Sequence, residues 1–116
     1  GARRCVFAET DGAACRTIRD NLETLGLTGA LVLQRDAVSV LRAERAAGHR
    51  HDLVLLDPPY GRWASLEPVI AELLPAVVSD GGILVVETDV RAEPVLPLAL
   101  VTSRRYGSAR LTLFSP

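Results

Sequence analysis

The stretch Asp57-Pro58-Pro59-Tyr60 places a carboxylate, two prolines and an aromatic ring directly after an apolar run, Leu53–Leu56. Proline fixes its own φ and biases the preceding residue towards extended geometry, so two prolines in succession stiffen the chain. We expect the Asp57 carboxylate and the Pro58 carbonyl to be free acceptors, with the Tyr60 ring beside them. This arrangement suits a planar ligand that carries an exocyclic –NH₂ group, such as a nucleobase. The alternative is a stiff turn whose aspartate caps the next helix and whose tyrosine packs against a sheet.

Three further acids, Glu9, Asp36 and Glu87, also follow apolar runs. A carboxylate at Glu9 could accept both hydroxyls of a ribose. Asp36 could accept from an adenine amino group, and the backbone N–H of Ala37 could donate to the same ring. For both acids the alternative is a helix cap, made by Glu9 or Asp11 at the first helix and by Asp36 at the second.

Apolar runs and three- to four-residue periodicity predict the elements that must position these side chains. In the third helix, Pro68 is expected in the first turn and Pro75 is expected to kink or end the helix. A turn is expected over Ser79–Gly82. The predicted strands cover residues 4–8, 30–34, 53–56, 83–87, 98–104 and 109–114, and the predicted helices cover residues 12–25, 38–47 and 66–78.

Alternating strands and helices predict an α/β fold, a doubly wound parallel sheet whose last two strands form an antiparallel hairpin at one edge. The run Leu53–Leu56 has no polar alternation, as expected for a strand covered on both faces. Ligands of such sheets bind beyond the carboxyl ends of the strands. We therefore expect the four acids to share one rim.

Composition limits the class of protein. The chain has 116 residues, is 48% hydrophobic and has a formal net charge of −1, which predicts one globular domain without a global electrostatic signature for nucleic acid. No apolar run approaches the roughly 20 residues that span a bilayer, and no secretory signal pattern opens the chain. The two cysteines form no C-x-x-C pair, and no metal-ligand spacing recurs. These features predict a cytoplasmic protein that binds neither metal nor membrane.

The residues also carry a family resemblance. The stretch "DLVLLDPPYGR" resembles motif IV, (D/N/S)-P-P-(Y/F/W), of amino-directed S-adenosylmethionine-dependent methyltransferases. With "FAETD", "IRDNLETLGL", "RDA", "GGILVVET" and "YGSARLTLF" in the same order, nearly the whole chain is similar to RsmD-type 16S rRNA guanine-N2 methyltransferases. The resemblance implies a Rossmann-like class I methyltransferase sheet, S-adenosyl-L-methionine as cofactor, and ribosomal RNA or the small ribosomal subunit as partner.

The resemblance also implies roles for the rim residues. The residues expected to hold the target base are Asp57, Pro58, Pro59 and Tyr60. The residues expected to bind the cofactor are Glu9, at its ribose, Asp36 and Ala37, at its adenine, and Thr10 and Asp57. Hydrogen bonds from guanine N2 to the acceptors of the turn would align its lone pair for attack on the sulfonium methyl, by positioning and electrostatics alone. A base within a helix would have to be extruded first.

One family motif, the glycine-rich turn D-x-x-x-G-[ST]-G-x-x-G, does not occur in this sequence. The chain therefore resembles a single, partial methyltransferase domain, residues 1–116, without its first and central strand. That strand would lie between the strands that hold Val6 and Val54, and its loss leaves their ladder groups unpaired. The two strands could pair directly, another chain could fill the gap, or the strand could lie outside this sequence. We expect the 116 residues alone to bind the cofactor weakly or not at all, and the oligomeric state stays open.

Two other functions are compatible with these residues. An adenine-N6 DNA methyltransferase would use the same turn for an adenine amino group, but the chain has no added DNA-recognition region. A non-catalytic nucleotide-binding or assembly module would have lost the cofactor turn.

Overall fold

The computed structural model describes all residues from Gly1 to Pro116, and the chain divides into two compact units, Gly1–Ala43 and Glu44–Pro116. The elements agree in number, type and order with those predicted from the sequence. In chain order they are β1 (Cys5–Ala8), α1 (Gly12–Thr24), β2 (Ala30–Leu33), α2 (Ala37–Ala47), β3 (His51–Leu56), α3 (Trp63–Val77), β4 (Val78–Asp89), β5 (Ala99–Tyr106) and β6 (Ala109–Ser115).

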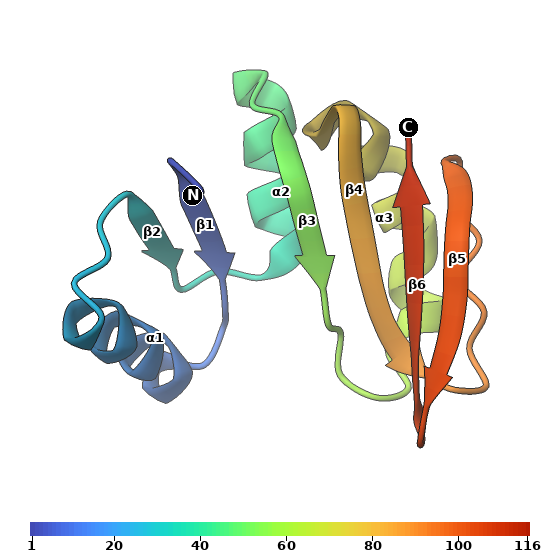
Figure 1. Ribbon diagram of the computed structural model, residues 1–116, viewed down its shortest axis with the longest axis horizontal. Coiled ribbons are helices and arrows are strands. Elements are labelled where there is room, and N and C mark those ends of the chain that lie inside the picture. The colour runs from blue at the N-terminus through green and yellow to red at the C-terminus, as the bar shows by residue number, and fades with distance from the viewer. The chain divides into compact units, whose positions relative to one another are not determined.

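The N-terminal unit contains a parallel pair of strands, β1 and β2, connected by α1 (Figure 1). The Asp11 carboxylate accepts a hydrogen bond from the Ala14 N–H at 2.9 Å, so Asp11 is the N-cap of α1. Of the two residues predicted as possible caps, Glu9 and Asp11, the second is therefore the cap. The chain leaves α1 through Gly26, whose φ of 65° lies in the left-handed region that ends helices. Both strands run the same way, so their carboxyl ends share one edge.

The C-terminal unit contains a four-stranded sheet in the order β3-β4-β6-β5 (Figure 1). β3 is parallel to β4, whereas β6 is antiparallel to both β4 and β5. The predicted hairpin is therefore confirmed, and its turn contains Gly107 with a φ of 61°. Within this hairpin, β6 lies inside the sheet, between β4 and β5, and β5 lies at the edge of the sheet.

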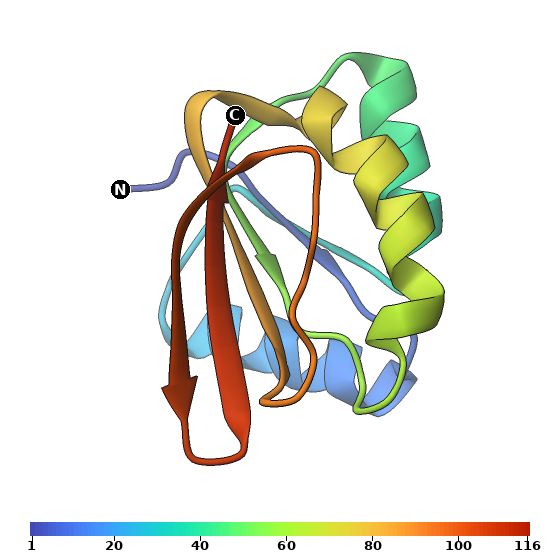
Figure 2. The same ribbon diagram turned by 90° about the vertical axis from the view of Figure 1, so that its right-hand side faces the viewer.

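Helix α3 lies along one face of this sheet and makes the core of the unit (Figure 2). Leu73, Leu74 and Val77 of the helix are fully buried. Burying an aliphatic side chain of this size stabilises a fold by about 1.5–3 kcal/mol, so this layer is the main source of stability in the unit. The sheet residues buried on the same face are Leu84, Val86, Thr88, Arg110, Thr112 and Phe114.

Two details of α3 differ from the sequence-based prediction. The helix begins at Trp63, three residues earlier than predicted, so Pro68 is its sixth residue and does not lie in the first turn. Pro75 does not end the helix, which continues to Val77. Pro75 is also exposed, so its ring points away from the core while the helix continues beneath it.

The opposite face of the sheet is exposed. Leu53 is 58% exposed, Leu55 is 68% exposed and Ile83, which pairs with Leu53, is 39% exposed. The prediction that the third strand is covered on both faces is therefore wrong for this chain. Strand side chains alternate between faces, and α3 covers only the face on the other side from these three residues.

The predicted turn at Ser79–Gly82 is also wrong, because β4 already begins at Val78. The register between β3 and β4 shifts between His51 and Leu53, and Gly81 has a φ of 77°. The Ser79 hydroxyl donates to the Asp52 carboxylate at 2.6 Å. The polar and glycine-rich residues thus form an irregular strand start rather than a separate turn.

Within the N-terminal unit β1 pairs with β2, and within the C-terminal unit β3 pairs with β4. Each helix is too short or too polar to cross a lipid bilayer. No group of three or more histidine, cysteine, aspartate or glutamate side chains is placed to hold a metal ion.

Candidate functional site

A tight turn follows β3 and carries the predicted acceptors. The Arg62 N–H donates to the Pro59 carbonyl at 3.1 Å, and Gly61 has a φ of 77°, as the third position of a type II turn requires. The Pro59 carbonyl therefore has a local partner and is not one of the free acceptors. The Pro58 carbonyl accepts no hydrogen bond from the chain.

Asp57 and Tyr60 are available to a ligand. Asp57 is exposed and forms no hydrogen bond or ion pair. The N-cap of α3 is Arg62, without any side-chain cap, so Asp57 does not cap that helix. Tyr60 is 68% exposed and its hydroxyl lies 3.4 Å from the Ser108 hydroxyl, so its ring does not pack into the sheet. The alternative prediction, in which Asp57 caps the next helix and Tyr60 packs against the sheet, is therefore wrong.

Two adjoining cavities, of about 280 and 540 Å³, open beside the turn. The smaller one is lined by Asp57 and by Glu87, so these two predicted rim residues come together. The larger one extends over the start of α3 and is lined additionally by Gly61, Trp63, Ala64, Arg91 and Ala92. Both cavities share Pro58, Pro59, Tyr60, Thr88 and Asp89.

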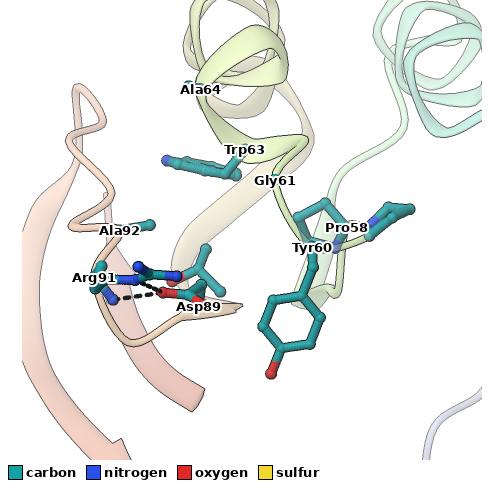
Figure 3. Close-up of a pocket in the computed structure, with 10 residues that line it drawn as sticks. Pro58, Tyr60, Gly61, Trp63, Ala64, Asp89, Arg91 and Ala92 are labelled. Carbon is teal, nitrogen blue, oxygen red and sulfur yellow. Dashed lines mark hydrogen bonds and ion pairs between the residues drawn. The ribbon is translucent and has the colours of Figure 1, made fainter. Parts of the chain in front are cut away.

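The wall opposite Tyr60 is formed by Asp89 and Arg91 (Figure 3). The Asp89 carboxylate accepts from the Arg91 backbone N–H at 2.8 Å and from its guanidinium Nε at 3.2 Å. These hydrogen bonds, the backbone one first, hold the pKa of the Asp89 carboxyl below its ordinary value. Asp89 is therefore an ionised carboxylate whose charge is locally compensated.

Trp63, the first residue of α3, lines the larger cavity and is linked through Glu67 to the loop that follows β4. The indole is buried, and its N–H donates to the Glu67 carboxylate. The same carboxylate oxygen accepts from the Val95 N–H at 3.2 Å. Glu67 thus joins the first turns of α3 to the loop, and the aromatic wall at Trp63 is held in place.

Four of the five expected cofactor residues lie in the N-terminal unit, where the carboxyl ends of β1 and β2 share one edge, and the fifth, Asp57, lies in the C-terminal unit. One Glu9 carboxylate oxygen accepts from the Asp11 N–H at 3.0 Å, and no partner contacts the other oxygen. Thr10 is exposed, and its carbonyl accepts from Gln34. One carboxylate oxygen of Glu9 therefore remains available for a ligand.

Asp36 is the N-cap of α2, which is the role predicted for it as the alternative to contact with an adenine amino group. Its two oxygens accept from the Ser39 N–H at 2.9 Å and from the Ser39 hydroxyl at 2.6 Å. These hydrogen bonds, the hydroxyl first, hold the pKa of Asp36 below its ordinary value. The N–H of Ala37, in the first turn of α2, has no acceptor within the helix. Asp36 can still accept from a ligand through its remaining lone pairs.

The pKa of Asp36 can be changed through its cap. We expect the Ser39→Ala variant, which removes the hydroxyl donor and keeps the N–H, to raise the Asp36 pKa towards its ordinary value. A lowered pKa in the folded state adds stability above the unfolded-state pKa, and that stability is lost as pH falls through the folded-state pKa. The variant should therefore lose less stability on acidification. Side-chain ¹³C titration by NMR measures the pKa, with Asp89 as the unchanged internal control. An unchanged Asp36 titration in the variant would contradict the assignment.

Sequence reasoning missed four residues whose polar or aromatic side chains line the cavities: Trp63, Thr88, Asp89 and Arg91. Thr88 and Asp89 could have been found, because they directly follow the predicted strand 83–87 and carboxyl strand ends carry ligand sites. Trp63 ends the stretch after the double proline, but nothing in its spacing assigns it to a cavity. Arg91 has no sequence signal, because only the Asp89 turn brings it to the wall.

Comparison with known proteins identifies a family and several proteins that are similar to this chain. The family described as "Conserved hypothetical protein 95" matches residues 1–115. The Bacillus subtilis (strain 168) protein named "Putative rRNA methyltransferase YlbH" is 31% identical over an alignment of 122 residues, which covers 98% of this chain and 64% of that protein. The chain thus spans less than two thirds of the length of this curated relative.

Two solved structures show the same fold. Hypothetical protein TTHA0928 of Thermus thermophilus is 31% identical, with a TM-score of 0.79 over 97% of this chain and 63% of that chain. A SAM-dependent methyltransferase from Agrobacterium tumefaciens is 14% identical, with a TM-score of 0.75 over 96% of this chain and 48% of that chain. The predicted α/β methyltransferase fold is therefore confirmed for the part of the fold that this chain contains.

Proposed function

This chain belongs to the Conserved hypothetical protein 95 family, the RsmD family, and from that membership we propose that it forms part of an S-adenosylmethionine-dependent rRNA methyltransferase. The methyl group is transferred to the exocyclic N2 of a guanine in small-subunit ribosomal RNA. The proposed partner is the RNA itself or the small ribosomal subunit, and the proposed location is the cytoplasm.

The observation that carries this proposal is the free acceptor pair of Asp57 and Pro58 at the carboxyl end of β3. An exposed carboxylate without a partner and an unpaired carbonyl lie in the wall of a cavity, next to an exposed tyrosine ring. An exocyclic amine has two N–H donors, which match two acceptors, and a base has a flat face, which matches Tyr60. No structural role of Asp57 within the chain competes with this one.

The residues of the N-terminal unit fit the adenosine part of S-adenosylmethionine. Glu9 has one carboxylate oxygen without a partner, which suits a ribose hydroxyl, and Thr10 lies next to it in the chain. Asp36 offers acceptor lone pairs to an adenine amino group, and the unpaired N–H of Ala37 offers a donor to the ring. When bound, the cofactor supplies an electrophilic methyl group on a sulfonium.

The chain's own residues position the nucleophile. The N2 lone pair of guanine is delocalised into the ring, and hydrogen bonds from the amine to Asp57 and to the Pro58 carbonyl pull the nitrogen towards tetrahedral geometry. The negative charge of Asp57 also stabilises the positive charge that develops on N2 during attack. Pro58 and Pro59 hold the acceptors stiffly, so that little reorganisation is needed.

The test is methyl transfer by the full-length protein. We expect radiolabel from S-adenosylmethionine to enter the RNA of small ribosomal subunits isolated from cells that lack the enzyme, and nucleoside analysis to identify N2-methylguanosine. Duplex DNA serves as the competing substrate. Label that enters only DNA, as N6-methyladenine, would contradict the proposal and favour the second enzyme class. No label in either substrate would favour the non-catalytic module.

A further inference from the structure

Thr88 is a buried polar residue without a hydrogen bond. It lies near the carboxyl end of β4, is 6% exposed, and lines both cavities beside the double-proline turn. Its hydroxyl oxygen has no partner in the chain. The only comparable group is the Thr112 hydroxyl on β6, which is 2% exposed, has no partner and lines neither cavity.

The other polar groups of the larger cavity are engaged by the chain. The Asp89 carboxylate accepts twice from Arg91, the Trp63 indole N–H donates to Glu67, and the Tyr60 hydroxyl lies beside that of Ser108. A buried hydroxyl without a partner costs free energy, because it has lost its bonds to water. The oxygen itself has almost no accessible surface, so a ligand at the cavity wall supplies the missing partner once the Thr88 side chain rotates about χ1.

We propose that Thr88 is a base-contacting residue, whose hydroxyl hydrogen-bonds the ring edge next to the amine held by Asp57 and Pro58. This inference rests on the proposed function and adds a contact to it. Thr88 lines the same cavities as Pro58 and Tyr60, so one base can touch all three residues. A hydroxyl both donates and accepts, and therefore satisfies either ring nitrogen that flanks guanine N2, the N1–H donor or the N3 acceptor.

Two valine variants separate this role from a structural one. Thr88→Val and Thr112→Val each remove a buried unpaired hydroxyl at nearly constant volume, so neither should lower the melting temperature. For methyl transfer to small ribosomal subunits by the full-length protein, we expect Thr88→Val to lower kcat/KM about tenfold, mainly through KM. Thr112→Val should transfer methyl as the natural protein does. Thr88→Ser restores the hydroxyl and should recover most of the activity.

A binding measurement keeps the inference testable without catalysis. In an NMR titration with guanosine, we expect Thr88→Val to bind about tenfold more weakly than the natural protein and Thr112→Val to bind equally well. Equal binding and transfer by Thr88→Val, or an equal loss in Thr112→Val, would overturn the inference alone. Guanosine binding that depends on Thr88 without any methyl transfer would overturn the proposed reaction and support the contact. No guanosine binding by the natural protein would overturn both.

Discussion

Replacement of Asp57 by alanine is expected to lower methyl transfer into small ribosomal subunits by about 10²–10³-fold, the loss that follows removal of one group that stabilises charge in a transition state. In the proposed function, the carboxylate is the charged member of the acceptor pair for the target amine. The melting temperature should not change, because Asp57 is exposed and has no hydrogen bond or ion pair in the fold.

Asp80→Ala is the matched control for this variant. Asp80 is an exposed aspartate near the start of β4, lines neither cavity and has no partner. It should leave transfer and stability unchanged. Undiminished transfer by Asp57→Ala would refute the role of the acceptor pair. A large fall in melting temperature would instead mean that Asp57 supports the turn.

Replacement of Leu73 by alanine is expected to give the largest loss of stability. Leu73 is fully buried between α3 and the sheet, and a leucine-to-alanine change in a core costs about 2–5 kcal/mol through lost burial and the cavity that remains. Chemical denaturation monitored by circular dichroism measures the change in the free energy of unfolding.

Leu55→Ala is the control on the other face of the sheet. Leu55 is 68% exposed, so the same substitution should change the free energy of unfolding of the 116-residue chain by no more than about 0.5 kcal/mol. Equal losses for Leu73→Ala and Leu55→Ala would mean that the face with Leu53 and Leu55 is covered in solution, and would contradict its exposure.

The acceptor turn was predictable because its chemistry is local. Two prolines after an apolar run constrain the backbone whatever surrounds them, so the exposed Asp57 and the free Pro58 carbonyl follow from four adjacent residues. The partner of the Pro59 carbonyl was not predicted, because it depends on the φ of Gly61 and on where α3 begins. Capping is also local, and Asp11 and Asp36 were both foreseen as caps.

The order and type of all nine elements follow from apolar periodicity, turn residues and caps, which act over a few residues and survive without tertiary contacts. The other results depend on residues far apart in the chain. Trp63, Thr88 and Arg91 line one cavity only because β3 and β4 pair in parallel, so that the residues after both strands meet. The exposure of Leu53 and Leu55 also depends on tertiary structure. An apolar run indicates which residues can be buried, but they are buried only where a second layer packs against that face of the strand.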